Sequence, residues 1–317
     1  MARFIIKRLL IALLIVFLVS IFAFSLMHIL PGDPARISLG MDASQEDVDA
    51  LREKMNLDKP LVQQYYLWIA GMARGDFGDS IVYNRPVKDI ILEKLPKTLS
   101  IGVPSLIISV TLGIVFGVIC AIKRGKFIDQ VLTFFSTVGI GTPQFWIGIL
   151  GIYLFGMRLR ILPIQGYVAP SDNFGDYIRH AIMPVFCMSL SMIASVARQT
   201  RSNMLDVINQ DYIRTARANG ISERSVIYKH SLRNTLIPII TIVAMQVRNV
   251  IGGSLIIENV FNIAGIGALL NVAVTNRDYL IVQTCTLIIS LVTVICNLIV
   301  DILYGVVNPQ IRINGGN

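Results

Sequence analysis

Charged residues are scarce in this sequence. Asp, Glu, Lys and Arg together make up 15% of the 317 residues, whereas 54% of the residues are hydrophobic and the mean hydropathy is +0.66. Soluble globular proteins usually carry about 25% charged residues. The chain is therefore expected to be an integral membrane protein.

Histidine and cysteine are sparse as well. The three histidines are far apart in the chain, so they do not form a zinc motif with the usual ligand spacing. All four cysteines lie in apolar segments without a CxxC spacing: Cys120, Cys187, Cys285 and Cys296. We expect them to be small packing residues that form neither a disulfide framework nor a metal site.

The sequence also lacks the motifs of several functional classes. It contains no phosphate-binding loop of the form GxxxxGK followed by Ser or Thr, so the chain is not expected to bind ATP. Its apolar segments contain no Ser/His/Asp arrangement and no paired carboxylates. This absence argues against a membrane-embedded hydrolase and against a secondary transporter with a coupling-ion site. We predict a chain with no catalytic residues and no cofactor of its own.

Six apolar stretches are long enough to cross about 30 Å of hydrocarbon. They lie at approximately 9–30, 99–122, 131–155, 181–197, 235–257 and 280–304. The first stretch follows Arg3, Lys7 and Arg8 and so resembles a signal peptide, but it is longer than a signal core. We therefore predict an all-α polytopic membrane protein with six transmembrane helices and a retained first helix at 1–30.

Residues 31–98 differ from the rest in being rich in charge. Amphipathic patterns at 46–55 and 61–72 predict helices in a small insert outside the bilayer. Asp33, in a Pro-Gly-Asp-Pro sequence, is expected to fix a turn after the first helix rather than to contact a substrate. Residues 99–307 are expected to form a five-helix core, followed by a tail at 308–317.

Orientation follows from the distribution of basic residues. The side that holds both termini carries fourteen basic and five acidic residues, whereas the opposite side carries thirteen basic and fifteen acidic residues. The positive-inside rule then places both termini in the cytoplasm and the 31–98 insert outside. The net charge of +8 is explained by this distribution and does not indicate a nucleic-acid partner.

A polar run at 198–234 lies between two of the predicted spans and carries seven basic residues. The segment 206–218 has few helix breakers, and Gly220 follows where a helix C-terminus favours a residue tolerant of positive φ. Ser222 and Glu223 suit the start of a second helix. The pattern predicts a helix, a glycine turn and a helix that protrude from the cytoplasmic face and dock on another protein. The alternative is a basic loop that only fixes topology.

Polar residues inside the predicted spans are few. Arg248 lies in the fifth span, with Gln246 and Asn249 beside it. An arginine at the bilayer centre costs about 2.5–3.5 kcal/mol on insertion scales, so it should face a protein partner or a watery cavity. We expect these residues either to line a translocation path or to form a packing network between subunits.

The third predicted span contains the sequence Gly-Ile-Gly-Thr-Pro, which ends at Pro143 and is followed by Gln144. A proline in this position should kink or break the helix, and broken helices in membranes often line a pathway. Pro143 and Gln144 are therefore further candidates for the path, although the neighbouring glycines alone would equally fit close helix packing.

The central run resembles the cytoplasmic EAA loop of ABC importer permeases, in the version found in the dipeptide, oligopeptide and nickel permease family. The resemblance rests on the run from DYIRTARANG to LRNTLIP (211–238) and on several other stretches, which follow one another in the family's order along essentially the whole chain. These are HILPGDPA (28–35), LDKPLVQQY (57–65), GDFGDS (75–80), LPIQGY (162–167) and LYGVVNPQIR (303–312).

The resemblance implies the fold of a type I ABC importer permease, of the kind that is the first of two permeases in its transporter. It also implies that the loop docks on an ATPase through Arg214, Thr215, Ala216, Arg217, Gly220, Ile221, Ser222 and Glu223. The sequence departs from the broad EAA pattern at three places. Arg214 and Thr215 replace its Glu-Ala, Arg233 replaces a proline, and Asn219 replaces a lysine common in the peptide-permease version. A glutamate-mediated contact to the ATPase is therefore not carried over.

The resemblance further implies a complex in a bacterial or archaeal cytoplasmic membrane. Its other members are a second homologous permease, two ATPase subunits that bind ATP and Mg, and an extracytoplasmic solute-binding protein. The expected substrates are di- or oligopeptides, with nickel, a metal-chelate or glutathione as alternatives. An ATP-independent channel or secondary transporter is the alternative from a different class.

Overall fold

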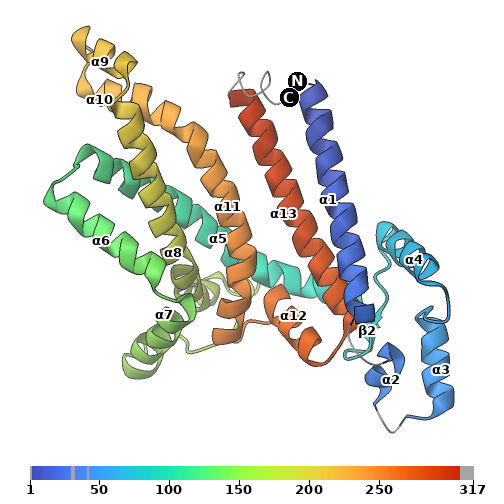
Figure 1. Cartoon of the computed structure of the whole chain (residues 1–317). Coiled ribbons are helices and arrows are strands. Elements are labelled where there is room, and N and C mark those ends of the chain that lie inside the picture. Colours follow the sequence, from blue (N-terminus) through green and yellow to red (C-terminus); the bar gives the residue numbers. More distant parts are fainter. Residues whose placement is uncertain (1, 30–32, 41–42, 308–317) are drawn as a thin grey trace.

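The computed structural model describes residues 2–29, 33–40 and 43–307 (Figure 1). Within these ranges it contains four helices that are long and apolar enough to cross a membrane. Two further pairs of helices pass the same test when each bent pair is counted as one span. The prediction of an all-α polytopic membrane protein is confirmed, and the six predicted spans are reached when each bent pair is counted as one span.

The long helices α5 (Val87–Ile122) and α8 (Phe174–Ile208) form the centre of the fold. They approach closely along a pair of glycines on α5, because a Cβ atom on Gly113 would lie 2.6 Å from Cβ of Val196 and one on Gly117 would lie 2.5 Å from Cβ of Thr200. Helix α5 begins well before the apolar stretch expected at 99–122. Its first turns are charged, so hydropathy alone does not detect them.

The third span is broken, as the proline predicts. Helix α6 (Phe127–Gly141) ends before Thr142 and Pro143, and α7 (Gln144–Gly151) continues into the π-helix η1 (Ile152–Arg158). The two parts meet at an angle of 99°. The fifth span, α11 (Leu232–Val260), is also bent, by 45° between its segments Pro238–Val247 and Gly252–Val260.

Helices α1 (Ala2–Ile29) and α13 (Tyr279–Val307) pack side by side, apart from the α5–α8 pair (Figure 1). The first turns of α1 and the last turns of α13 lie at the same end of the molecule, where Nη1 of Arg8 lies 2.7 Å from Oδ2 of Asp301. Most of the apolar side chains of α1 are exposed, which fits a helix that faces lipid.

The segment after α1 folds as a small helical insert. It contains α2 (Pro34–Leu39), α3 (Gln45–Lys54), α4 (Leu61–Arg74) and a two-residue hairpin of β1 (Asp79–Ser80) and β2 (Arg85–Pro86). The two predicted amphipathic helices are confirmed as α3 and α4. Asp33 begins α2 by accepting a hydrogen bond from N of Ala35, at 3.1 Å, and it pairs with Arg52, so its role in the structure is to fix this turn.

The segment between the spans expected at 235–257 and 280–304 contains a further helix that was not predicted. Helix α12 (Ile266–Thr275) lies between α11 and α13. Its ten residues are too few to span a bilayer, so its sequence does not resemble a membrane span.

Candidate functional site

The central polar run folds as a compact elbow at the end of α8, and we call residues 211–231 the elbow. It consists of α9 (Asp211–Ala218), the one-turn helix α10 (Glu223–Ser225) and the π-helix η2 (Val226–Ser231), which leads directly into α11. The elbow lies at the same end of the molecule as the start of α1 (Figure 1). The predicted helix, turn and second helix are present, although the second helix is mostly π-helical.

Gly220 makes the turn between the two helices. Its φ is 77°, in the region that side chains disfavour, and its N–H donates to the carbonyl of Arg217 at 3.0 Å. The next N–H, of Ile221, donates to the carbonyl of Ala216 at 3.2 Å. Ser222 precedes α10 as expected, but its side chain makes no capping hydrogen bond; its carbonyl accepts from N of Val226.

The elbow has an apolar core of its own. Ile213, Ala216 and Val226 are buried against one another, and Ile221 packs on them. The next residue along, Ile227, is buried against the C-terminal turns of α5 and α8, together with Val118, Ala121 and Met204. The elbow therefore has a core of its own, packs on the ends of α5 and α8, and is continuous with α11.

The predicted ATPase-contact residues fall into two groups. Ala216 is 9% exposed and Ile221 is half-buried, so both face the elbow's core and not its surface. The other six are exposed: Arg214, Thr215, Arg217, Gly220, Ser222 and Glu223. Two further residues of the elbow, Tyr212 and Tyr228, are exposed and were not predicted as contact residues. The available sequence signal was the presence of aromatic side chains within a basic run.

Arg217 and Glu223 form a bidentate ion pair across the turn. Nε of Arg217 donates to Oε2 of Glu223 at 3.0 Å, and Nη2 donates to Oε1 at 2.8 Å. The hydrogen bond from the guanidinium lowers the pKa of the Glu223 carboxyl below its usual range and raises the pKa of Arg217. The pair fixes the spacing of α9 and α10 around Gly220.

The candidate path residues gather around α8. Nε2 of Gln144 donates to Oγ of Ser191 at 2.7 Å, and Nε2 of Gln246 lies 3.5 Å from Oγ of Ser195, one turn further along α8. Nδ2 of Asn249 donates to Oε1 of Gln246 at 3.0 Å. The structure thus brings α7, α8 and α11 together through neutral polar side chains at the depth of the apolar segments.

Pro143 and Arg248 are the remaining two path candidates. Pro143 is exposed at the break between α6 and α7. The side chain of Arg248 lies outside the described residues. Gly253 of α11 lies beside Gln144, since a Cβ atom there would come within 3.1 Å of Oε1. This close approach explains how the short helix α7 can rest on α11.

A buried acid near the end of α11 joins three helices. Glu258 is 1% exposed; its Oε1 accepts from Oγ1 of Thr98 on α5 at 2.6 Å, and its Oε2 accepts from N of Ala268 on α12 at 2.9 Å. Oγ1 of Thr98 accepts in turn from N of Ile266 at 2.8 Å. A Cβ atom on Gly265 would lie 2.5 Å from Glu258, so glycine is required there. The Gly-x-Gly sequence at 265–267 was the available signal that the chain makes a close contact here.

A second buried acid ties the insert to the helical bundle. Oδ2 of Asp278, just before α13, accepts from Oγ of Ser80 at 2.6 Å and from N of Val82 at 3.3 Å. Among the described residues there is no group of three or more His, Cys, Asp or Glu side chains that could hold a metal ion.

Comparison with known proteins agrees with this architecture. Residues 113–313 match the family described as the inner membrane component of binding-protein-dependent transport systems, and residues 1–102 match the N-terminal region of such components. These systems are ABC transporters in which membrane subunits work with a solute-binding protein and other subunits.

Three relatives span nearly the whole chain. A "probable peptide ABC transporter permease protein" of Sinorhizobium fredii is 39% identical over 312 residues, which cover 98% of this chain and 100% of the relative. An oligopeptide transport system permease of Bacillus subtilis is 40% identical over 315 residues, with coverage of 98% and 100%. A glutathione transport system permease of Escherichia coli is 38% identical over 312 residues, with coverage of 98% and 99%.

The matched regions include the elbow, the broken third span and the insert, and together they account for most of the described fold. The chain is a multi-pass membrane protein that belongs to the family of inner membrane components of binding-protein-dependent ABC transport systems.

Proposed function

We propose that this chain is one of two permeases in an ABC importer of di- or oligopeptides. Two ATPase subunits that bind ATP and Mg dock on the elbow, a second homologous permease completes the path, and a solute-binding protein delivers the peptide. The observation that carries the proposal is the rigid, basic elbow at the end of α8, in a chain whose relatives are named peptide and oligopeptide permeases.

Alternating access follows from how the elbow is attached. Closure of the ATPases displaces α9 and α10, and the buried contacts of Ile227 with Val118 and Met204 transmit that displacement to α5 and α8. Because η2 continues into α11, the same motion changes how α11 meets α7 and α8 at Gln144 and Gln246. The path then opens to the outside, and ATP hydrolysis resets the inward-facing state.

Membrane orientation is part of the proposal. The basic elbow and both termini lie in the cytoplasm of a bacterium or archaeon, and the insert at 31–98 lies outside, where it contacts the binding protein or covers the entrance. Cytoplasmic placement of the elbow is required, since ATP is available to the ATPases on that side only.

Glutathione is the second candidate substrate, because one relative of similar identity is named a glutathione permease. Glutathione is a modified tripeptide, so it offers much of the amide chemistry of an ordinary short peptide. Uptake assays with a dipeptide, a tetrapeptide and glutathione, each in competition with the others, would rank the three substrates.

Co-purification tests the docking role of the elbow. We expect two ATPases and a second permease to purify with the tagged wild-type chain, and the ATPases to be lost from Gly220→Arg, because an exposed arginine at this turn blocks close approach. Gly125→Arg is the matched control: Gly125 also has positive φ, of 75°, and open space around it, but lies outside the elbow. A wild-type chain that purifies as a homo-oligomer without ATPases would contradict the proposal.

Energy coupling is tested separately in proteoliposomes that contain the whole complex and its binding protein. Peptide uptake should require ATP and should stop when the ATPase catalytic carboxylates are replaced by neutral amides. Uptake that continues at the same rate without ATP hydrolysis would instead indicate a channel or a secondary transporter.

A further inference from the structure

Helix α13 has two faces of different character. Its exposed apolar side chains lie on one face, and all are exposed by 39% or more: Leu291, Val292, Ile295 and Ile299. Ser290, Thr293, Asn297 and Asp301 recur at spacings of three and four residues, which places them on the opposite face. The apolar face suits lipid, so the polar face must be turned toward protein or water.

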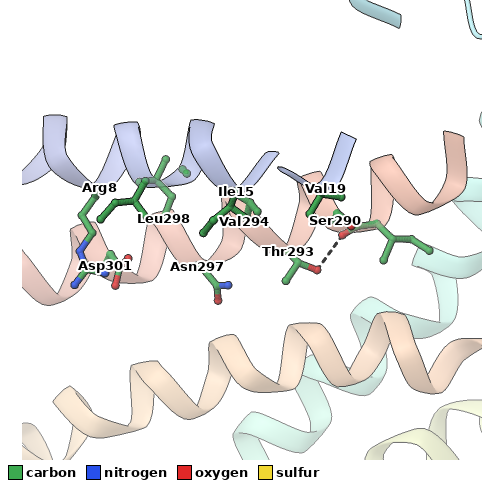
Figure 2. Close-up of a pocket in the computed structure, with 12 residues that line it drawn as sticks. Arg8, Ile15, Val19, Ser290, Thr293, Val294, Asn297, Leu298 and Asp301 are labelled. Atoms are coloured by element: carbon green, nitrogen blue, oxygen red, sulfur yellow. Dashed lines mark hydrogen bonds and ion pairs between the residues drawn. The ribbon is translucent and has the colours of Figure 1, made fainter. Parts of the chain in front are cut away.

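The polar face lines a hollow between α13 and α1. This groove has a volume of about 270 Å³, and its α1 side is apolar, with Ile11, Ile15 and Val19 (Figure 2). The ion pair between Arg8 and Asp301 lies at its cytoplasmic end. Since the two helices pack along their length, the groove is an indentation in a folded surface and not a gap between separate parts.

Two side chains of the polar face have no partner among the described residues. Ser290 and Asn297 make no side-chain hydrogen bond there, and Thr293 donates only to the carbonyl of Ile289 in its own helix, at 2.9 Å. Leaving an amide without partners in hydrocarbon costs several kcal/mol. Because no described residue satisfies Asn297, its amide is available to water, a substrate or another chain in the assembled transporter.

The direction of the polar face favours contact with water or a substrate over contact with another chain. Figure 2 shows Thr293 and Asn297 on the side of α13 that is turned toward α11. Helix α11 also carries Asn249, whose side chain is exposed and donates to Gln246, which is itself buried against α8, so both neighbouring helices have an exposed carboxamide at membrane depth. Asn297 is more than a third exposed.

We propose that Ser290, Thr293 and Asn297 form a substrate-contact face of α13 on the translocation path, and that its ligand is the main chain of a peptide. The inference rests on the proposed peptide transport. A carboxamide both donates and accepts hydrogen bonds, and a hydroxyl does the same, so this face pairs with peptide N–H and C=O groups regardless of the side chains. Such a face suits a path for peptides of varied sequence.

Cysteine accessibility tests whether the face is wet. Asn297→Cys and the matched lipid-side control Ile299→Cys are made in a Cys296→Ala background, since the other three cysteines are buried. The assembled complex is reconstituted in liposomes and treated with a negatively charged methanethiosulfonate, which does not enter hydrocarbon. We expect Asn297→Cys to react at least about tenfold faster than Ile299→Cys. Equal rates, or cross-linking of Asn297→Cys to the second permease in place of reaction, would overturn the proposal.

Substrate protection tests the ligand. Saturating tetraalanine, delivered with the binding protein and ATP, should slow the reaction of Asn297→Cys, and a tetrapeptide with lysine or glutamate side chains should slow it to the same extent. Protection by one charged peptide only would overturn main-chain recognition. In a parallel uptake assay Asn297→Gln should retain transport, whereas Asn297→Leu should reduce it severalfold; equal uptake by both would contradict a substrate contact.

These results are separable from failure of the proposed function. If wild-type vesicles take up no peptide at all, the peptide assignment fails, whereas the difference in reaction rate between Asn297→Cys and Ile299→Cys still reports whether the face lines an aqueous path. If wild-type uptake is normal and the two rates are equal, the function stands and the α13 site is wrong.

Discussion

Glu258 places one carboxylate between three helices. It is buried and bonded to Thr98 of α5 and to the first turn of α12, and the N-terminus of a helix favours a negative charge. An isolated buried charge would be strongly unfavourable, so these hydrogen bonds are what allow an acid at this position. Sequence analysis could not find the contact, because Thr98 and Glu258 are 160 residues apart and each is ordinary in its own local context.

Glu258→Ala should destabilise the protein, because it leaves the Ala268 N–H without its acceptor and opens a cavity. The expected loss is about 1–3 kcal/mol for each unpaired group. The loss of stability is measured by heating the purified complex in detergent and monitoring the remaining folded protein by size-exclusion chromatography. Glu93→Gln is the control: Glu93 is also in an ion-paired cluster, but its side chain is 41% exposed, so little change is expected. Similar melting temperatures for Glu258→Ala and wild type would contradict the bridging role.

The Arg217–Glu223 pair makes a prediction about pH. The hydrogen bond from Arg217 lowers the pKa of Glu223 in the folded protein, so the pair stabilises the elbow fully above the pKa of Glu223 in the unfolded chain. That contribution is lost as the pH falls through the lowered pKa. Both side chains are more than a third exposed, so their coupling should not exceed about 1 kcal/mol. A double-mutant cycle with Arg217→Ala and Glu223→Ala, measured by thermal unfolding at neutral and acidic pH, should give a coupling that decreases on acidification; an unchanged coupling would contradict it.

Helices and breaks were predictable at the scale of elements, whereas their ends and contacts were only partly so. The amphipathic patterns identified α3 and α4, and Pro143 identified the break, because both signals are local. The early start of α5 and the existence of α12 were missed, since charged first turns and a ten-residue apolar helix do not resemble membrane spans. The contact of Gly113 and Gly117 with α8 could not be predicted, because small residues favour close packing without indicating which helix is the neighbour.

The packing of α5 on α8 gives a prediction with an internal control. A methyl group on Gly117 would lie 2.5 Å from Cβ of Thr200 and 2.6 Å from the backbone carbonyl oxygen of Ala197, so Gly117→Ala forces the two helices apart. We expect a loss of about 1–3 kcal/mol, the usual cost of overpacking, and a lower yield of assembled complex. Gly141→Ala, at an α6 glycine with no atom within 4 Å of the added methyl group, should be neutral or slightly stabilising. Thermal melting of both variants decides the matter, and equal effects would argue against close contact of α5 and α8.

At the scale of the whole molecule, the elbow and the insert lie at different ends. The elbow and the first turns of α1 are at one end, and α2 and α3 are at the other (Figure 1). The proposed function needs this separation, because in it the ATPases dock on the elbow while a binding protein delivers the substrate at the opposite end. The distribution of basic residues also predicts that the elbow and the insert lie on opposite sides of the membrane. It does not predict where any residue lies relative to its neighbours.

Orientation can be measured with two cysteines of similar exposure. Val62→Cys lies on α4 of the insert, where Val62 is 82% exposed, and Phe127→Cys lies at the start of α6, where Phe127 is 78% exposed. In intact cells or spheroplasts an impermeant maleimide should label Val62→Cys, whereas Phe127→Cys should be labelled only after the membrane is permeabilised. The native cysteines are buried or half-buried, so the background is low. Labelling in the reverse order would put the elbow outside, away from ATP, and the elbow could not then be the site where ATP hydrolysis acts on this chain.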